Sequence, residues 1–133
     1  MHRLCLDIET LPAEEANHGA LRILFDKRKA KKKKECCEEP GDFEQYLLGT
    51  SFDGSFGRIL CIAYAIDDKP VECLNGDKDE AKMLQEFWKI VESISIPAKN
   101  LQWPDYGVQF IGHNVIDFDL RFIYQRSIEI GRA

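Results

Sequence analysis

Residues 3–10 read Arg-Leu-Cys-Leu-Asp-Ile-Glu-Thr, and apolar side chains alternate along them. In a β-strand, residues i and i+2 lie on the same face. The alternation therefore predicts a strand that ends near Glu9. One of its faces would carry Leu4, Leu6 and Ile8. The opposite face would carry Asp7 and Glu9 side by side.

Two carboxylates this close repel each other unless one is protonated or a metal ion bridges them. Oxygen ligands of this kind suit magnesium or manganese. Taken alone, Asp7 and Glu9 could equally be the end of a strand that meets solvent. The pair becomes informative when it is combined with a second stretch of the chain.

That second stretch is Ile-Gly-His-Asn-Val-Ile-Asp-Phe-Asp-Leu-Arg-Phe, at residues 111–122. Residues 108–111, Val-Gln-Phe-Ile, predict a strand, and a helix is predicted to start around Asn114 to Asp117. Asp119 would then lie near the start of a helix, where the helix dipole stabilises an anion.

Together the two stretches resemble the DnaQ-like 3′–5′ exonucleases of the DEDD superfamily. The branch most similar is related to the proofreading domain of family-B DNA polymerases. The first family motif, Asp-x-Glu, matches Asp7 and Glu9. The second, Asn-x-x-x-Phe-Asp, matches Asn114, Phe118 and Asp119, with Gly-His directly in front.

The resemblance implies an α/β fold of the ribonuclease H-like kind. Strands 1, 2 and 3 would form an antiparallel meander, with strand 4 parallel to strand 1 and helices flanking the mixed sheet. Residues 1–133 would form a single 3′–5′ exonuclease-like domain with an insert at 11–56. A fifth strand and a final helix are not found in the sequence, so the domain is expected to be C-terminally truncated.

The resemblance also implies a two-metal hydrolysis of phosphodiester bonds. Asp7, Glu9 and Asp119 would be the catalytic residues and would hold two Mg²⁺ or Mn²⁺ ions. Activity is expected to be impaired, because the family's third motif, a Tyr or His followed by a fourth carboxylate, is missing. Asp117 cannot replace that carboxylate, since it lies on the same helical turn as Asp119.

Four further residues are expected to bind substrate: Thr10, Leu11, Asn114 and Phe118. The expected partners are the 3′ ends of single-stranded nucleic acid, DNA before RNA, and a polymerase or repair protein of unknown identity. A second function remains open. The chain could be a non-catalytic nucleic-acid-binding or scaffolding remnant of the same fold.

The rest of the chain predicts helices at 13–30 and 42–48 and strands at 58–66 and 71–74. The strand at 58–66 is apolar on both faces, which predicts a central strand covered on both sides, with Ile59 and Cys61 on one face. Asp77 and Glu80 have the spacing of a helix cap. A helical apolar stripe follows at 83–91, and residues 96–106 are expected to be a loop.

Composition fits one soluble domain, with 44% hydrophobic and 31% charged residues among 133. The net charge of −5 argues against a general nucleic-acid coat. We expect no membrane span, no signal peptide and a cytoplasmic location. The odd number of cysteines and the lack of Cys-x-x-Cys argue against disulfides and zinc. Cys5, Cys61 and Cys73 are expected to pack as small apolar groups.

Three features keep more than one interpretation. The run at 27–34 carries seven positive charges and is either a mobile, solvated surface or a phosphate contact. His113 could be a ligand, a base or a structural hydrogen-bonding residue. Cys36 and Cys37 lie beside lysines and are either a plain exposed pair or a reactive thiol.

Overall fold

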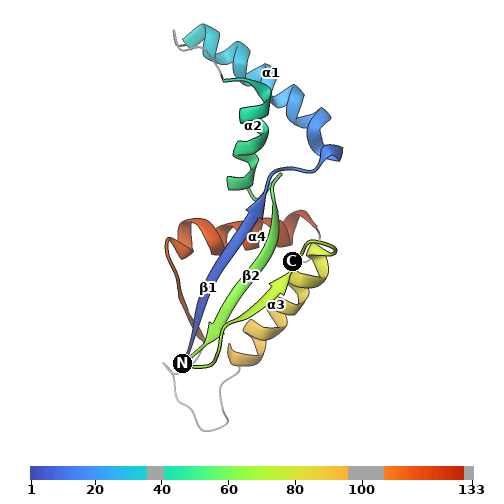
Figure 1. Cartoon of the computed structure of the whole chain (residues 1–133). Helices are drawn as coiled ribbons and strands as arrows, with labels where there is room; N and C mark the ends of the chain where they lie inside the picture. Colours follow the sequence, from blue (N-terminus) through green and yellow to red (C-terminus); the bar gives the residue numbers. More distant parts are fainter. Residues whose placement is uncertain (36–40, 96–106, 131–133) are drawn as a thin grey trace.

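The fold is built on a four-stranded mixed sheet (Figure 1). The computed structural model describes residues 1–35, 41–95 and 107–130. The strands lie in the order β3-β2-β1-β4, with bounds β1 His2–Leu11, β2 Arg58–Ile66, β3 Glu72–Asn75 and β4 Val108–Ile111. β2 is antiparallel to β1 and β3, whereas β4 is parallel to β1. This strand order and these directions confirm the predicted α/β meander with a parallel fourth strand.

β1 follows its alternating sequence closely. Leu4, Leu6 and Ile8 are buried, and the residues between them are exposed. The strand continues two residues past the predicted end at Glu9 and stops before Pro12, whose ring disfavours continued regular pairing. Asp7 and Glu9 therefore share one exposed face, as the alternation predicted.

β2 departs from simple alternation because of a bulge. Glu9 pairs with Cys61, but the next residue of β1, Thr10, pairs with Ile59, so Leu60 is an extra residue in β2. An extra residue changes the face on which the following side chains lie. Ile59 is buried on the same face as Ile62 and Tyr64. The predicted grouping of Ile59 with Cys61 is therefore wrong.

One face of the sheet carries the core. The helices α3 (Glu80–Ser95) and α4 (Arg121–Glu129) both lie behind the sheet in Figure 1. The core joins the buried β1 and β2 residues to Met83, Leu84, Phe87, Phe122 and Ile123. The stripe predicted at 83–91 thus faces the core, with Trp88 and Val91 partly buried beside it.

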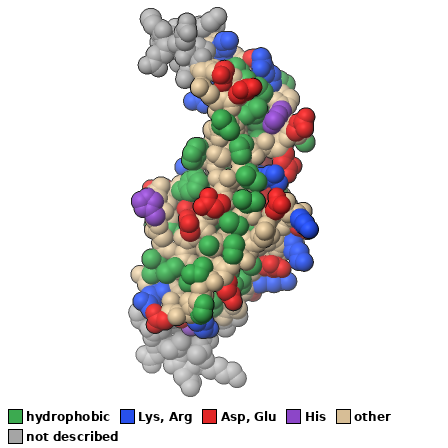
Figure 2. All heavy atoms as spheres, viewed as in Figure 1, with side chains coloured by type: hydrophobic (Ala, Val, Ile, Leu, Met, Phe, Trp, Pro, Cys, Tyr) green, Lys and Arg blue, Asp and Glu red, His purple; other side chains and the backbone are tan. Residues whose placement is uncertain are grey.

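The opposite face of the sheet is not covered by the described helices. In Figure 2, viewed from this side, hydrophobic and acidic side chains are exposed together over the strands. Cys5 and Cys73 are exposed and Cys61 is half-buried. The expectation that β2 is covered on both sides is wrong, and so is the expectation that all three cysteines are packed.

The start of α3 also differs from its prediction. Asp79, not Asp77, caps the helix, because its carboxylate accepts the backbone N–H of Lys82 at 3.0 Å. Glu80 faces inward instead. Its carboxylate accepts the backbone N–H of Ile59 at 2.5 Å and pairs with Arg126 at 2.5 Å, and both charged side chains are 13% exposed. This ion pair joins the start of β2, the start of α3 and the end of α4.

The insert forms a helical arm that projects beyond the sheet (Figure 1). It contains η1 (Glu15–Asn17), α1 (His18–Glu35), α2 (Phe43–Gly49) and η2 (Thr50–Phe52). Phe25 packs against the rings of Phe43 and Tyr46, with centroid distances of 5.6 and 5.4 Å. The predicted helix at 13–30 is shifted toward the C-terminus, and the predicted short helix at 42–48 is confirmed as α2.

The positively charged run at 27–34 lies within α1. The side chains of Lys27, Arg28, Lys29 and Lys31 are exposed. Cys36, Cys37 and the expected loop at 96–106 lie outside the described residues. In the described ranges, the helices are too short or too polar to cross a membrane.

Candidate functional site

The candidate site lies at the edge of β1 beyond the end of β4. β4 pairs with residues 2–5 of β1, and the chain then turns at Gly112. A Cβ atom at Gly112 would lie 2.6 Å from the carbonyl oxygen of Leu6 and 3.2 Å from the Cβ of Val115. The missing side chain lets the chain after β4 approach the β1 backbone directly. It then enters the one-turn π-helix η3 (Val115–Leu120).

Asn114 begins this turn in the left-handed backbone region, with φ of 51° and ψ of 33°. Asparagine tolerates this conformation better than most residues that carry a Cβ. Its carbonyl oxygen accepts the backbone N–H of Phe118 at 3.0 Å. Single π turns are frequent at functional sites, where they alter the direction of neighbouring side chains. Here the turn places Asp119 against β1.

Asp119 is a buried acid with an incomplete set of partners. Its side chain is 3% exposed, and its Oδ2 atom has no hydrogen-bond partner among the described residues. Burial raises the pKa of this carboxyl, and the nearby charge of Asp7 raises it further. The backbone amides of Ile8 and Asp119 and the charge of His113 lower the pKa in part. The charge of Asp7 therefore acts on the buried carboxyl of Asp119 at this edge of β1.

Glu9 lies two residues beyond Asp7 on the same exposed face of β1. It is opposite Cys61 on β2, and its charge is one cause of the raised pKa of the Cys61 thiol, after burial and the neighbouring Cys73. Asp119 lies in the turn after β4, which borders β1 on its other side. Within residues 1–35, 41–95 and 107–130, no three His, Cys, Asp or Glu side chains are placed to hold one metal ion. The expected ligand set of Asp7, Glu9 and Asp119 is therefore not assembled here.

The residues expected to bind substrate lie in two different parts of the structure, the end of β1 and the turn at η3. The hydroxyl of Thr10 donates a hydrogen bond to the carbonyl of Ser51 at 2.6 Å, and Leu11 is half-buried beside it. Both residues thus fix the arm to the sheet. Phe118 and Asn114 lie in the turn next to Asp119, and Phe118 is half-buried.

Two residues near the pair were not predicted from the sequence. Phe52 is 75% exposed, and its ring centroid lies 6.2 Å from that of Phe118. Both rings line a hollow of about 250 Å³ that also includes Arg121. Phe52 falls in the polar stretch Ser-Phe-Asp-Gly-Ser. The sequence signal that could have identified Phe52 is a large aromatic residue without apolar neighbours in a polar stretch.

Comparisons with protein-family models, curated proteins and solved structures found no significant match. The geometry itself therefore has to indicate what the site can do. It combines a buried carboxylate that lacks a hydrogen-bond partner at Oδ2 among the described residues, a second carboxylate whose charge acts on it, and, at the neighbouring Phe118, a hollow lined by aromatic rings, Arg121, Asp53 and Asp117. Such a set can hold a divalent cation next to a phosphate-bearing ligand.

Proposed function

We propose that this protein is a metal-dependent 3′–5′ exonuclease with a ribonuclease H-like fold. The observation that carries the proposal is the buried Asp119 at the free edge of β1, where the charge of Asp7 helps to raise the pKa of its carboxyl. The sheet supports it, because the parallel pairing of β4 with β1 brings two motifs more than one hundred residues apart to one place.

The residues present fit a divalent cation in one respect. The Oδ2 atom of Asp119 is buried without a hydrogen bond from the described residues, and a buried lone carboxylate oxygen is costly unless a partner neutralises it. Asp7 and Asp119 would hold the ion. Magnesium is commonly bound by one or two carboxylates together with substrate phosphate, so a third protein carboxylate is not essential for weak binding.

A divalent ion at such a site can activate water and stabilise the leaving oxygen of a phosphodiester. The protein's own groups position the substrate. Phe118 and Phe52 present rings on which a terminal base can stack, and Arg121 places a positive charge in the same hollow. Glu9 adds negative charge on the exposed face of β1. With two carboxylates instead of a larger ligand set to hold the ion, slow cleavage is expected.

The test is hydrolysis of a single-stranded DNA of about 20 nucleotides carrying a 5′ label, with Mg²⁺ or Mn²⁺. A 3′–5′ exonuclease produces a ladder of progressively shorter labelled products. Asp7→Asn and Asp119→Asn should each abolish the ladder, whereas Asp77→Asn, at an exposed site before α3, should leave it unchanged. Endonucleolytic products, or cleavage that survives both site substitutions, would refute the proposal.

A non-catalytic role on the same fold is the second candidate. The absence of a three-carboxylate set in the described part of the chain favours it. Mn²⁺ binding, followed by electron paramagnetic resonance, separates the two. Binding that is lost in Asp7→Asn and Asp119→Asn supports the enzyme, and unchanged Mn²⁺ spectra on addition of the protein support the non-catalytic role.

A further inference from the structure

Three hollows follow one another from the helical arm to the carboxylate pair. The first, of about 210 Å³, lies between α1 and α2 and shares Arg28 and Tyr46 with the second. The second, of about 340 Å³, shares Phe52 and Asp53 with the third. The third is the 250 Å³ hollow that includes Phe118. Because neighbouring hollows share wall residues, they lie next to one another, and we call this series the path.

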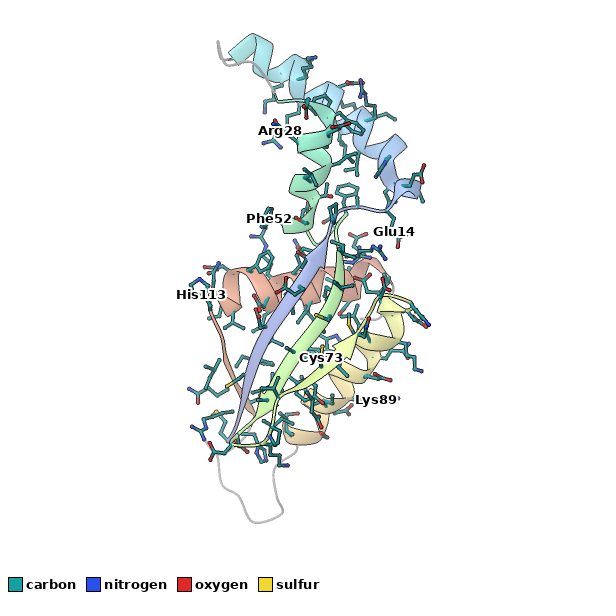
Figure 3. All side chains as sticks on the ribbon, viewed as in Figure 1. Glu14, Arg28, Phe52, Cys73, Lys89 and His113 are labelled. Atoms are coloured by element: carbon teal, nitrogen blue, oxygen red, sulfur yellow. The ribbon has the colours of Figure 1, made fainter. Side chains whose placement is uncertain are left out.

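Figure 3 shows the direction of this path. Arg28, Phe52 and His113 follow one another along the same side of the molecule, from the arm to the junction before η3. Lys89, on α3, lies on the other side. The third hollow includes Asp117 and Phe118, so the path ends at η3, the turn that also contains Asp119.

Positive charges accompany the path. Arg28 lines the first two hollows, Lys29 lines the first, and Arg121 lines the third. Lys27 and Lys31 are exposed on the same helix as Arg28. Such charges neutralise phosphates and release counterions, which is the main source of affinity for a nucleic-acid backbone.

Aromatic rings alternate with these charges. Tyr46 stands between the first and second hollows, Phe52 between the second and third, and Phe118 lies in the third. Phe52 is 75% exposed although it is large and apolar. Tyr46 and Phe118 are half-buried. An exposed ring beside basic side chains is a usual platform for unpaired bases, whereas a base-paired duplex hides the faces of its bases.

Three acidic residues, Asp42, Asp53 and Asp117, also line these hollows, and two of them accept backbone hydrogen bonds. The carboxylate of Asp42 accepts the N–H of Gln45 at 2.7 Å, and that of Asp53 accepts the N–H of Ser55 at 2.9 Å. A docking groove for a protein would present a mainly apolar floor with a polar rim. Here three Arg or Lys side chains, three Asp side chains and several aromatic rings share the walls.

We infer that the arm formed by α1 and α2 binds single-stranded nucleic acid and leads its 3′ end to Asp7 and Asp119. Phosphates would contact Arg28 and Lys29, and bases would stack on Tyr46 and Phe52. The direction of the strand rests on the proposed exonuclease function. The binding itself does not, because it needs neither the metal ion nor hydrolysis.

The test measures binding by fluorescence anisotropy in EDTA, with 5′-labelled oligothymidine of 20 and of 4 nucleotides and a blunt 20-base-pair duplex. The 20-nucleotide strand should bind about tenfold more tightly than the other two. Phe52→Ala should weaken its binding about tenfold, as expected for one lost stacking partner. Circular dichroism checks that each variant remains folded.

Arg28→Gln with Lys29→Gln should also weaken binding of the long strand. It should also reduce the slope of log affinity against log salt by about 1.4, because each of the two lost phosphate contacts contributes about 0.7 for a single strand. The matched control is Lys82→Gln with Lys89→Gln, which removes the same charge from exposed positions on α3. This control should keep both the affinity and the salt slope of the unmodified protein.

Two results would overturn the inference. One is equal affinity and salt slope in the arm variant and the α3 control. The other is duplex binding as tight as binding of the long single strand. Failure of the enzyme proposal looks different: the long strand binds through the arm in EDTA, yet added Mn²⁺ produces no cleavage.

Discussion

Gly112 lies directly against the carbonyl oxygen of Leu6, so that a Cβ atom added to the glycine would come within 2.6 Å of that oxygen. The neighbour is backbone in the middle of β1 and cannot move aside cheaply. The close approach of these two residues is what holds η3, and with it Asp119, at the edge of the sheet.

Gly112→Ala should therefore lower the free energy of unfolding by about 1–3 kcal/mol, the usual cost of overpacking, and should weaken Mn²⁺ binding at the same time. Urea denaturation and Mn²⁺ titration measure the two effects. Gly19→Ala is the matched control, since a Cβ there meets nothing within 4 Å and the residue lies in α1. That control should leave Mn²⁺ binding intact and stability equal or slightly higher.

The buried Asp119 predicts an unusual dependence of stability on pH. Its pKa in the folded protein lies above the ordinary value of 3.8, mainly because of burial and then because of Asp7. The folded state therefore retains a proton that the unfolded state loses, and the contribution is fully present below pH 3.8. It is lost as pH rises through the folded pKa, so stability without metal should fall over that interval.

Asp119→Asn removes this titration. Thermal unfolding in EDTA, followed from pH 4 to pH 8, should show a higher midpoint at pH 8 for the variant and a smaller decrease with pH. Added Mg²⁺ should raise the midpoint of the unmodified protein at pH 8 but not that of the variant. A midpoint that rises equally with pH in both proteins would contradict the assignment of the raised pKa to Asp119.

The Glu80–Arg126 ion pair should contribute to stability through its shielding from water. Arg126→Met preserves much of the side-chain length but leaves Glu80 with the backbone N–H of Ile59 as its remaining described hydrogen-bond donor. Removing one partner of a buried pair typically costs about 3–5 kcal/mol. Because both side chains are 13% exposed, we expect about 3 kcal/mol from urea denaturation. Glu80→Gln in addition should restore part of that loss, and a further decrease would argue against a shielded charge.

Two substitutions at Asn114 can separate its role in the backbone conformation from a role in substrate binding. Asn114→Gly should leave the stability almost unchanged, since glycine adopts a positive φ without steric cost. Asn114→Ala should lower the stability by about 1 kcal/mol, because a Cβ disfavours the left-handed region. If the amide also contacts substrate, both variants lose kcat/KM on single-stranded DNA. Full activity in the stable Asn114→Gly variant would restrict Asn114 to its backbone role.

The sheet could be predicted from the sequence because its signals are local. Alternation in β1 and the short apolar run of β4 define two strands, and the family resemblance placed them side by side. The bulge at Leu60 could not be predicted in this way. Every residue from Ile59 to Ile66 is apolar, so the pattern contains no polar position that would reveal a change of face.

Tertiary contacts decided the remaining differences. Asp77 and Asp79 both precede α3, and the sequence alone does not distinguish which one caps it. The contacts of Glu80 determine where α3 begins. Its carboxylate accepts the N–H of Ile59 and pairs with Arg126, which is 46 residues away in the sequence.

The helical arm has its own aromatic cluster and meets the sheet at the ends of β1 and β2. Its length can therefore vary without disturbing the strands that position Asp7. One additional turn in α1 and in the chain that returns from it would extend the arm by about 5.4 Å. In this architecture the reach of the molecule and its chemistry are separable traits, free to evolve or to be engineered independently.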